Sequence, residues 1–129
     1  MPRYVVQQHF REKDHFHFDL MLEREGVLVT FASGAPPDME AELPCLVHHL
    51  GDHRLAYLEY EGEISGGRGW CAVHDRGTFE WIEPEGGRLL ECADEIRIRL
   101  EGELARGTYR LVREPASGTD YWRLKRVTP

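Results

Sequence analysis

Every second residue from Phe16 to Leu22 is apolar, and the residues between them are mainly polar. Successive side chains of a β-strand point to opposite faces, so this period of two predicts a strand with two different faces. The face that we expect to be buried consists of Phe16, Phe18, Leu20 and Leu22. The opposite face consists of His15, His17, Asp19 and Met21, and it gathers two imidazoles and one carboxylate.

Shorter stretches of similar composition predict further strands. They are rich in β-branched and aromatic residues, bounded by Gly, Pro or Asp, and lie at residues 27–32, 43–50, 55–60, 95–101, 108–113 and 121–126. The first follows the central strand after a Gly-containing turn, which predicts a hairpin. Residues 70–74 and 78–82 predict a second hairpin around a turn at residues 75–77. Pro44 makes 43–50 an edge strand or a strand that starts late.

The spacing of these strands indicates the fold. No segment has the apolar stripe of a long helix, and only residues 38–43 are expected to form a helical turn. Many short strands joined by Gly-rich turns are typical of an antiparallel barrel or a closed sandwich, and closure removes exposed strand edges. We therefore predict a mainly β fold: a small closed antiparallel β-barrel with short helical turns at most, formed as a single domain by residues 1–129.

Composition is typical of a soluble globular protein, with 30% charged and 41% hydrophobic residues among 129. No apolar run approaches the roughly 20 residues that span a bilayer. The first residues also lack the apolar region of a secretory signal, so we expect a cytoplasmic protein without a membrane partner. The three cysteines are widely spaced and form no Cys-x-x-Cys pair, which favours free thiols over a disulfide framework.

The formal net charge of −7 argues against tight non-specific binding of nucleic acid, which depends on cations that neutralise phosphates. It does not exclude an enzyme that meets one strand end through a local basic patch or a metal ion. Residues 106–113 and 121–126 are locally basic. For both segments the simpler interpretation, a solvated strand face, is favoured.

Three residues are candidate metal ligands. His17 and Asp19 share the polar face of the central strand, and His9 can join them if its own segment pairs with that strand. Two imidazoles and a carboxylate suit a first-row divalent ion such as manganese, iron or zinc. No cysteine is near them in the sequence, which argues against a structural zinc site. The alternative is a solvent-facing strand with incidental histidines, and spacing alone leaves both open.

Three further residues are candidates for binding phosphate. His53 lies in a turn, where a rigid scaffold often presents functional side chains, although it could equally cap a nearby carbonyl. Tyr57 offers a hydroxyl, but a half-buried aromatic is the favoured interpretation. Arg68 belongs to the Gly-rich loop 66–69, whose backbone amides and guanidinium could approach a phosphate. None of the three cysteines shows a sign of activation as a nucleophile.

The order of these residues resembles the 3′-phosphoesterase domain of bacterial DNA ligase D. That family has motifs close to VVQxH, HYDFRLE, EDHPLDY and FEG, followed by WDxGTY. The matching segments of this chain are residues 5–9, 17–23, 52–57, 60–62 and 75–79. Residues 100–104, 107–111 and 122–125 resemble its closing strands, so the resemblance covers most of the chain.

The resemblance implies a small β-barrel that heals the 3′ ends of nucleic-acid strands in a manganese-dependent way. Members of the family remove a terminal ribonucleoside and then a 3′-phosphate before sealing in non-homologous end joining. Carried over by motif, His9, His17 and Asp19 would hold the metal. His53 would contact the phosphate and act in proton transfer, with Tyr57 in the same pocket.

The chain departs from the family pattern at three points. Met21 stands where the family has the Arg of HYDFRLE, so a phosphate-binding guanidinium is missing from the strand, and Arg68 and Arg76 are the candidate replacements. Two residues are added before the HFD triplet, which makes His15 a rival to His17 as a ligand. The chain also begins almost at VVQxH, without the upstream arm of ligase-linked domains, as expected for a stand-alone relative.

We therefore predict a metal-dependent 3′-phosphoesterase that removes 3′-phosphate, and by resemblance a 3′-ribonucleoside, from nucleic-acid ends in DNA repair. Mn²⁺ is the expected cofactor, with Zn²⁺ or another transition metal as alternatives, and a separate DNA ligase or polymerase is a candidate partner. Two other functions stay open. One is a catalytically inactive module that keeps the metal and binds an end or a repair partner, and the other is a phosphoesterase for a small phosphorylated metabolite.

Overall fold

Residues 1–127, which the computed structural model describes, form ten strands and five short 3₁₀ helices. The strands are β1 (Arg3–Glu12), β2 (His15–Arg24), β3 (Val27–Ser33), β4 (Cys45–His49), β5 (His53–Arg54), β6 (Gly62–Glu63), β7 (Trp70–Glu83), β8 (Glu95–Gly102), β9 (Arg106–Arg113) and β10 (Tyr121–Arg126). The 3₁₀ helices are η1 (Glu40–Glu42), η2 (Leu55–Leu58), η3 (Glu85–Gly87), η4 (Leu90–Cys92) and η5 (Pro115–Ser117). The predicted domain end at residue 129 lies outside the described residues. Among these, no helix is long and apolar enough to cross a membrane.

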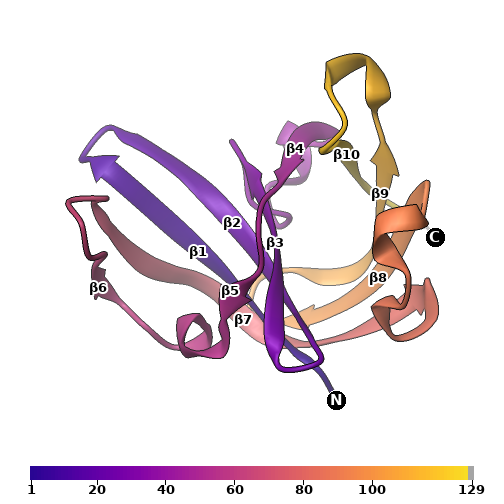
Figure 1. The fold of residues 1–129 in the computed structure, drawn as a ribbon, viewed down its shortest axis with the longest axis horizontal. Coiled ribbons are helices and arrows are strands. Elements are labelled where there is room, and N and C mark those ends of the chain that lie inside the picture. The colour runs from indigo at the N-terminus through magenta and orange to yellow at the C-terminus, as the bar shows by residue number, and fades with distance from the viewer. Residues whose placement is uncertain (128–129) are drawn as a thin grey trace.

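Eight of the strands close into an antiparallel barrel (Figure 1). Hydrogen-bonded neighbours follow the order β1-β2-β3-β4-β10-β9-β8-β7, and β7 pairs with β1 to complete the ring. The two short strands are additions, since β5 pairs with β3 and β6 with β7. The predicted fold class, a closed antiparallel barrel with helical turns at most, is confirmed.

Two hydrophobic clusters cover opposite faces of β1 and β2. The larger cluster fills the barrel, and it includes Leu20 and Leu22 of β2 together with the inward residues of β8. The smaller cluster lies on the other face, where Val5 and Met21 pack against Leu58 of η2. Because alternate residues of β1 and β2 serve the two clusters, these strands are covered on both sides for part of their length.

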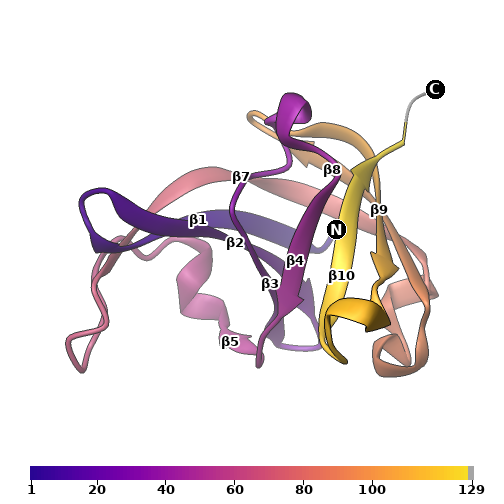
Figure 2. The ribbon, with the colours of Figure 1, turned by 90° about the horizontal axis from the view of Figure 1, so that it is seen from above.

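β1, β2 and β7 extend together beyond the closed part of the barrel as a three-stranded arm (Figures 1 and 2). Phe16, which we expected in the core, lies one residue from the start of β2 at the end of this arm and is 43% exposed. It packs on Phe10 and Phe18, with ring centroids 5.3 and 5.8 Å away. The other three residues of the predicted apolar face are buried in the barrel.

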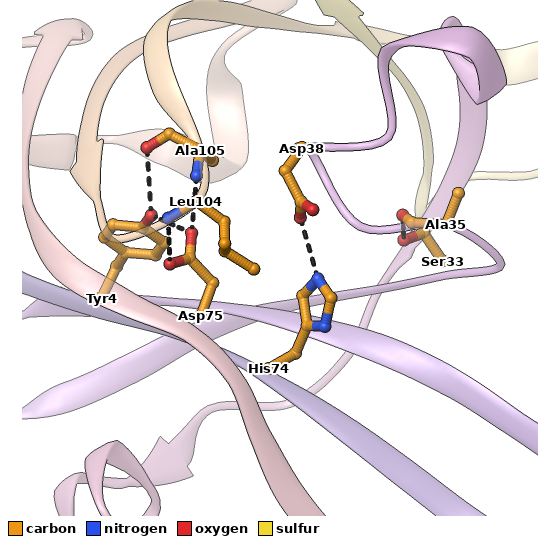
Figure 3. Close-up of polar contacts among 8 residues, drawn as sticks. All are labelled: Tyr4, Ser33, Ala35, Asp38, His74, Asp75, Leu104 and Ala105. Atoms are coloured by element: carbon orange, nitrogen blue, oxygen red, sulfur yellow. Dashed lines mark hydrogen bonds and ion pairs between the residues drawn. The ribbon is translucent and has the colours of Figure 1, made fainter.

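The hairpin predicted at residues 70–82 was wrong, because this segment is one continuous strand, β7. Asp75 and Gly77 indicated a turn, but in the folded chain each makes a contact within the barrel. Asp75 is 1% exposed and accepts a hydrogen bond from the Tyr4 hydroxyl at 2.6 Å (Figure 3). Gly77 lies against β8, where an ideal Cβ would be only 2.2 Å from the carbonyl oxygen of Glu101. Glycine at this position permits a close approach of two strands.

Two other local predictions changed in the folded chain. Residues 55–60 contain η2 instead of a strand, and Leu55 and Leu58, spaced one 3₁₀ turn apart, both pack on the smaller cluster. β4 lies between β3 and β10, so it is not an edge strand. It does start late, after Pro44, whose missing N–H therefore costs no ladder hydrogen bond. The β2–β3 hairpin and the helical turn within residues 38–43 are confirmed.

Candidate metal and phosphate site

The three candidate metal ligands lie side by side on the arm. β1 and β2 pair in a register that places His9 opposite His17, and Gln7 opposite Asp19. Alternation turns these side chains to the face away from the barrel interior. One potential ligand atom from each of His9, His17 and Asp19 lies within 4.8 Å of the other two. The pairing of β1 with β2, which was the condition for His9 to join the other two candidate ligands, is therefore present.

Asp19 provides a test of whether this group fits a cation. Its side chain is almost fully buried, and Oδ1 lies 3.1 Å from Nε2 of His17 without making a hydrogen bond of acceptable geometry. The contact is thus close but poorly directed. A buried carboxylate oxygen that lacks a donor is costly, and a divalent ion would supply the missing charge. The residues present fit a metal ion.

His9 is oriented by the Gly-rich loop between β6 and β7. Its Nε2 lies 2.8 Å from the carbonyl oxygen of Arg68. A carbonyl only accepts, so Nε2 carries the proton and Nδ1 keeps its lone pair for an ion. The loop can approach β1 because residue 69 is glycine: its φ is +93°, and an ideal Cβ would lie 1.9 Å from the carbonyl oxygen of Phe10.

A pocket of about 90 Å³ opens beside this group. One wall is the arm, with His9, Asp19 and Met21, and the other is the segment from β5 to the Gly-rich loop. That segment lies here because β5 pairs with β3 and η2 packs on the smaller cluster. It contributes three of the predicted phosphate ligands to the pocket, namely His53, Tyr57 and Arg68.

His53 caps a carbonyl, which is one of the two interpretations considered from the sequence, and it also lies at the pocket. Its Nδ1 lies 2.9 Å from the carbonyl oxygen of Gly51, so it caps that carbonyl and holds the proton on Nδ1. The ring also lines the pocket and meets the ring of Tyr57 edge-on, with centroids 5.8 Å apart. Nε2 is consequently the nitrogen that remains available to a bound molecule.

Two sequence candidates lie elsewhere. His15 is exposed at the end of the arm, where it is paired with Glu12 after a β-bulge in β1, and it is outside the three-residue group. Arg76 does not line the pocket, and its Nε is 3.8 Å from Oε1 of Glu103. The structure therefore does not bring these two residues to the site.

Three pocket residues were missed from the sequence, namely Gln7, Ile64 and Cys71. Gln7 donates through Nε2 to the carbonyls of Tyr57 and Tyr60, at 2.8 Å each, while its buried Oε1 has no donor. Its position two residues before His9 could have indicated a shared face. Cys71 is paired with His9 across β1 and β7, which no local pattern predicts. Burial raises the pKa of the Cys71 thiol. The argument that no cysteine is near the cluster considered only distance along the sequence, and it was wrong because Cys71 lies beside His9 in the folded chain.

The chain belongs to the DNA ligase D 3′-phosphoesterase domain family, because the sequence model of that family matches residues 7–113. Among its relatives are multifunctional non-homologous end joining proteins LigD. That of Mycolicibacterium smegmatis is 35% identical over 118 residues, which cover 85% of this chain and 15% of the relative. Those of Pseudomonas aeruginosa and Mycobacterium bovis are 32% and 30% identical and cover 90% and 96% of this chain. The chain spans only 14% and 16% of those two proteins.

Proposed function

We propose that this protein is a metal-dependent 3′-phosphoesterase that removes 3′-phosphate, and by extension a 3′-ribonucleoside, from nucleic-acid ends in DNA repair. A separate ligase or polymerase would then use the healed end. The proposal is supported by membership of the family and by its relatives' names. The observation that carries it is the buried, donor-free Oδ1 of Asp19 beside His9 and His17, in a pocket that also contains His53.

In this proposal His9, His17 and Asp19 would hold a divalent ion, for which we propose Mn²⁺. When bound, such an ion would polarise a phosphoryl oxygen and offset the charge that develops in the transition state. His53 takes up a second proton from solvent on Nε2, donates that N–H to the phosphate and transfers the proton to the leaving 3′ oxygen, while the hydrogen bond from its Nδ1 to the carbonyl of Gly51 keeps the ring in place.

Arg68 takes the place of the guanidinium that is missing at Met21. Met21 is 2% exposed and its side chain belongs to the smaller cluster, so position 21 contributes packing instead of charge. Arg68 lines the same pocket, and its guanidinium donates from Nε to the carbonyl of Ser65 at 2.7 Å and from Nη2 to the hydroxyl of Ser65 at 3.2 Å. These bonds to neutral oxygens hold the guanidinium without neutralising its charge, which suits it to a phosphate.

Arg68→Gln is expected to lower kcat/KM for 3′-phosphate release by about tenfold or more, because a hydrogen bond to a charged group contributes about 1.5–3 kcal/mol. The backbone carbonyl that orients His9 is retained in this variant. The matched control is Arg76→Gln, which removes the other candidate guanidinium outside the pocket and should leave kcat/KM unchanged. Equal losses in the two variants would contradict the role of Arg68.

The experiment that tests the proposed function is phosphate release from a 3′-phosphorylated primer-template in the presence of Mn²⁺. We expect release by the wild type and a loss of at least about 100-fold in His53→Ala, because general acid–base catalysis contributes about 10²–10⁴-fold. Mn²⁺ affinity should be retained in that variant, since His53 is not a ligand. A folded wild type that binds Mn²⁺ and ends but releases no phosphate would indicate a binding module. Competition by a small phosphate ester but not by ends would indicate a metabolite phosphoesterase.

A further inference from the structure

Cys71 continues a row of candidate ligands across the three strands of the arm. β2 pairs His17 with His9, and β7 pairs Cys71 with the same His9 from the other side. Directly opposite residues of an antiparallel pair have Cβ atoms about 4.5–5.5 Å apart and point to the same face. The thiol of Cys71 is thus a neighbour of the imidazole of His9, although the two residues are far apart in the chain.

The thiol of Cys71 faces the pocket, and its hydrogen bond to the carbonyl of Tyr60 is a weak one. Cys71 is 3% exposed and lines the pocket together with Asp19 and Met21. Sγ donates a long hydrogen bond to the carbonyl of Tyr60 at 3.8 Å, and it lies outside the group of three close ligand atoms. A thiol is a weak donor and χ1 has three staggered positions, so a rotation about this one bond is the movement that would direct the sulfur toward an ion.

A second observation indicates that a cation belongs here. Among residues 1–127, no group donates a hydrogen bond to the buried Oδ1 of Asp19, which lines the same pocket and is 4% exposed. The thioether of Met21 lines the pocket as well, so two sulfur atoms lie beside two imidazoles and one carboxylate. Soft sulfur ligands favour zinc and similar ions over manganese, which prefers oxygen and nitrogen ligands.

We propose that the pocket binds a thiophilic divalent ion, such as Zn²⁺ or Co²⁺, with Cys71 as a fourth protein ligand beside His9, His17 and Asp19. This inference rests on the metal site of the proposed function. A bond forms between the sulfur and the ion, and the thiol proton leaves to solvent. The carboxylate of Asp19 and the thiolate of Cys71 then balance the two positive charges.

The number of protein ligands bound to the ion decides whether phosphate can reach it. Four protein ligands complete a tetrahedral site, whereas catalytic sites keep a position open for water or substrate. A hard ion such as Mn²⁺ leaves Cys71 protonated and that position open. The same residues therefore form an active site with Mn²⁺ and a closed, inhibited site with Zn²⁺. Removal of the thiol should relieve the inhibition.

The test is a titration of the reduced, metal-free protein with Co²⁺, followed by absorption. Visible d–d bands report bound Co²⁺, and a near-ultraviolet thiolate-to-cobalt band reports a Co–S bond. The wild type should show both. Cys71→Val and Cys71→Ser should lose the near-ultraviolet band and retain the visible ones, with thermal unfolding measured to establish that each variant is folded. Cys45→Ser and Cys92→Ser, which change thiols elsewhere in the fold, are the matched controls and should retain both bands.

The outcomes separate this inference from the function on which it rests. Visible bands without a near-ultraviolet band in the wild type would overturn the role of Cys71 and leave the metal site intact. A near-ultraviolet band that survives in Cys71→Val would overturn it too. Absence of binding of both Co²⁺ and Mn²⁺ would overturn the metal site itself, and with it the proposed metal-dependent function. Inhibition of Mn²⁺-dependent release by Zn²⁺ in the wild type, but not in Cys71→Ser, would support the closed site.

Discussion

Replacement of His17 by alanine is expected to abolish measurable Mn²⁺ binding and to lower 3′-phosphate release by at least about 100-fold. The imidazole of His17 lies 3.1 Å from the buried Oδ1 of Asp19, and its ring centroid is 4.8 Å from that of His9. Without it, only two of the three candidate ligands remain. Charge stabilisation by a metal contributes several kcal/mol to a phosphoryl transition state, and each 1.36 kcal/mol corresponds to a factor of ten in rate.

His15→Ala is the matched control for this prediction. His15 is two residues away on the same strand, but it is exposed at the end of the arm and paired with Glu12. The variant should therefore bind Mn²⁺ and release phosphate as the wild type does. Binding is measured by calorimetric titration with Mn²⁺, and release is measured on the 3′-phosphorylated primer-template. If His15→Ala lost binding and His17→Ala kept it, the ligand assignment would be reversed.

Asp75→Ala is expected to lower the free energy of unfolding by about 3–5 kcal/mol, because it removes the acceptor of three hydrogen bonds, two of which are buried. The carboxylate accepts the Tyr4 hydroxyl at 2.6 Å and the backbone N–H groups of Leu104 and Ala105 at 2.8 and 3.0 Å (Figure 3). It thereby connects β1 and β7 to the turn between β8 and β9. Burial, together with the hydrogen bond to Asp75, also raises the pKa of the Tyr4 phenol.

Urea-induced unfolding, with ΔG extrapolated to water, measures this effect. Tyr4→Phe removes one hydroxyl from the same network and leaves the two N–H groups bonded to Asp75, so it should cost only about 1–2 kcal/mol. Phosphate release should persist in both variants at temperatures where they are folded, because neither residue lines the pocket. A loss in Asp75→Ala no larger than that in Tyr4→Phe would contradict the central role of the carboxylate.

Local patterns in the sequence were sufficient for much of the fold. Strict alternation identified β2 and β8, and turn residues located the β2–β3 hairpin, because a strand with one buried face must place apolar residues at every second position. The same patterns failed where a residue's partner lies far away in the chain. Asp75 and Gly77 resembled a turn, yet one is bonded to Tyr4 and the other makes room for β8.

The candidate site divides in the same way. The sequence by itself determined that His17 and Asp19 share one face of a strand, since that depends only on the period of β2. His9 could join them only if its segment paired with that strand, and the family motifs then implied metal binding for His9 and phosphate contact for His53, roles that stay predictions. Three further placements could be read only from the folded chain: His15 lies outside the group, Arg68 and not Arg76 lines the pocket, and Cys71 is a neighbour of His9. These outcomes depend on strand register and on how the segment from β5 to β7 packs, and both are determined by contacts between distant parts of the chain.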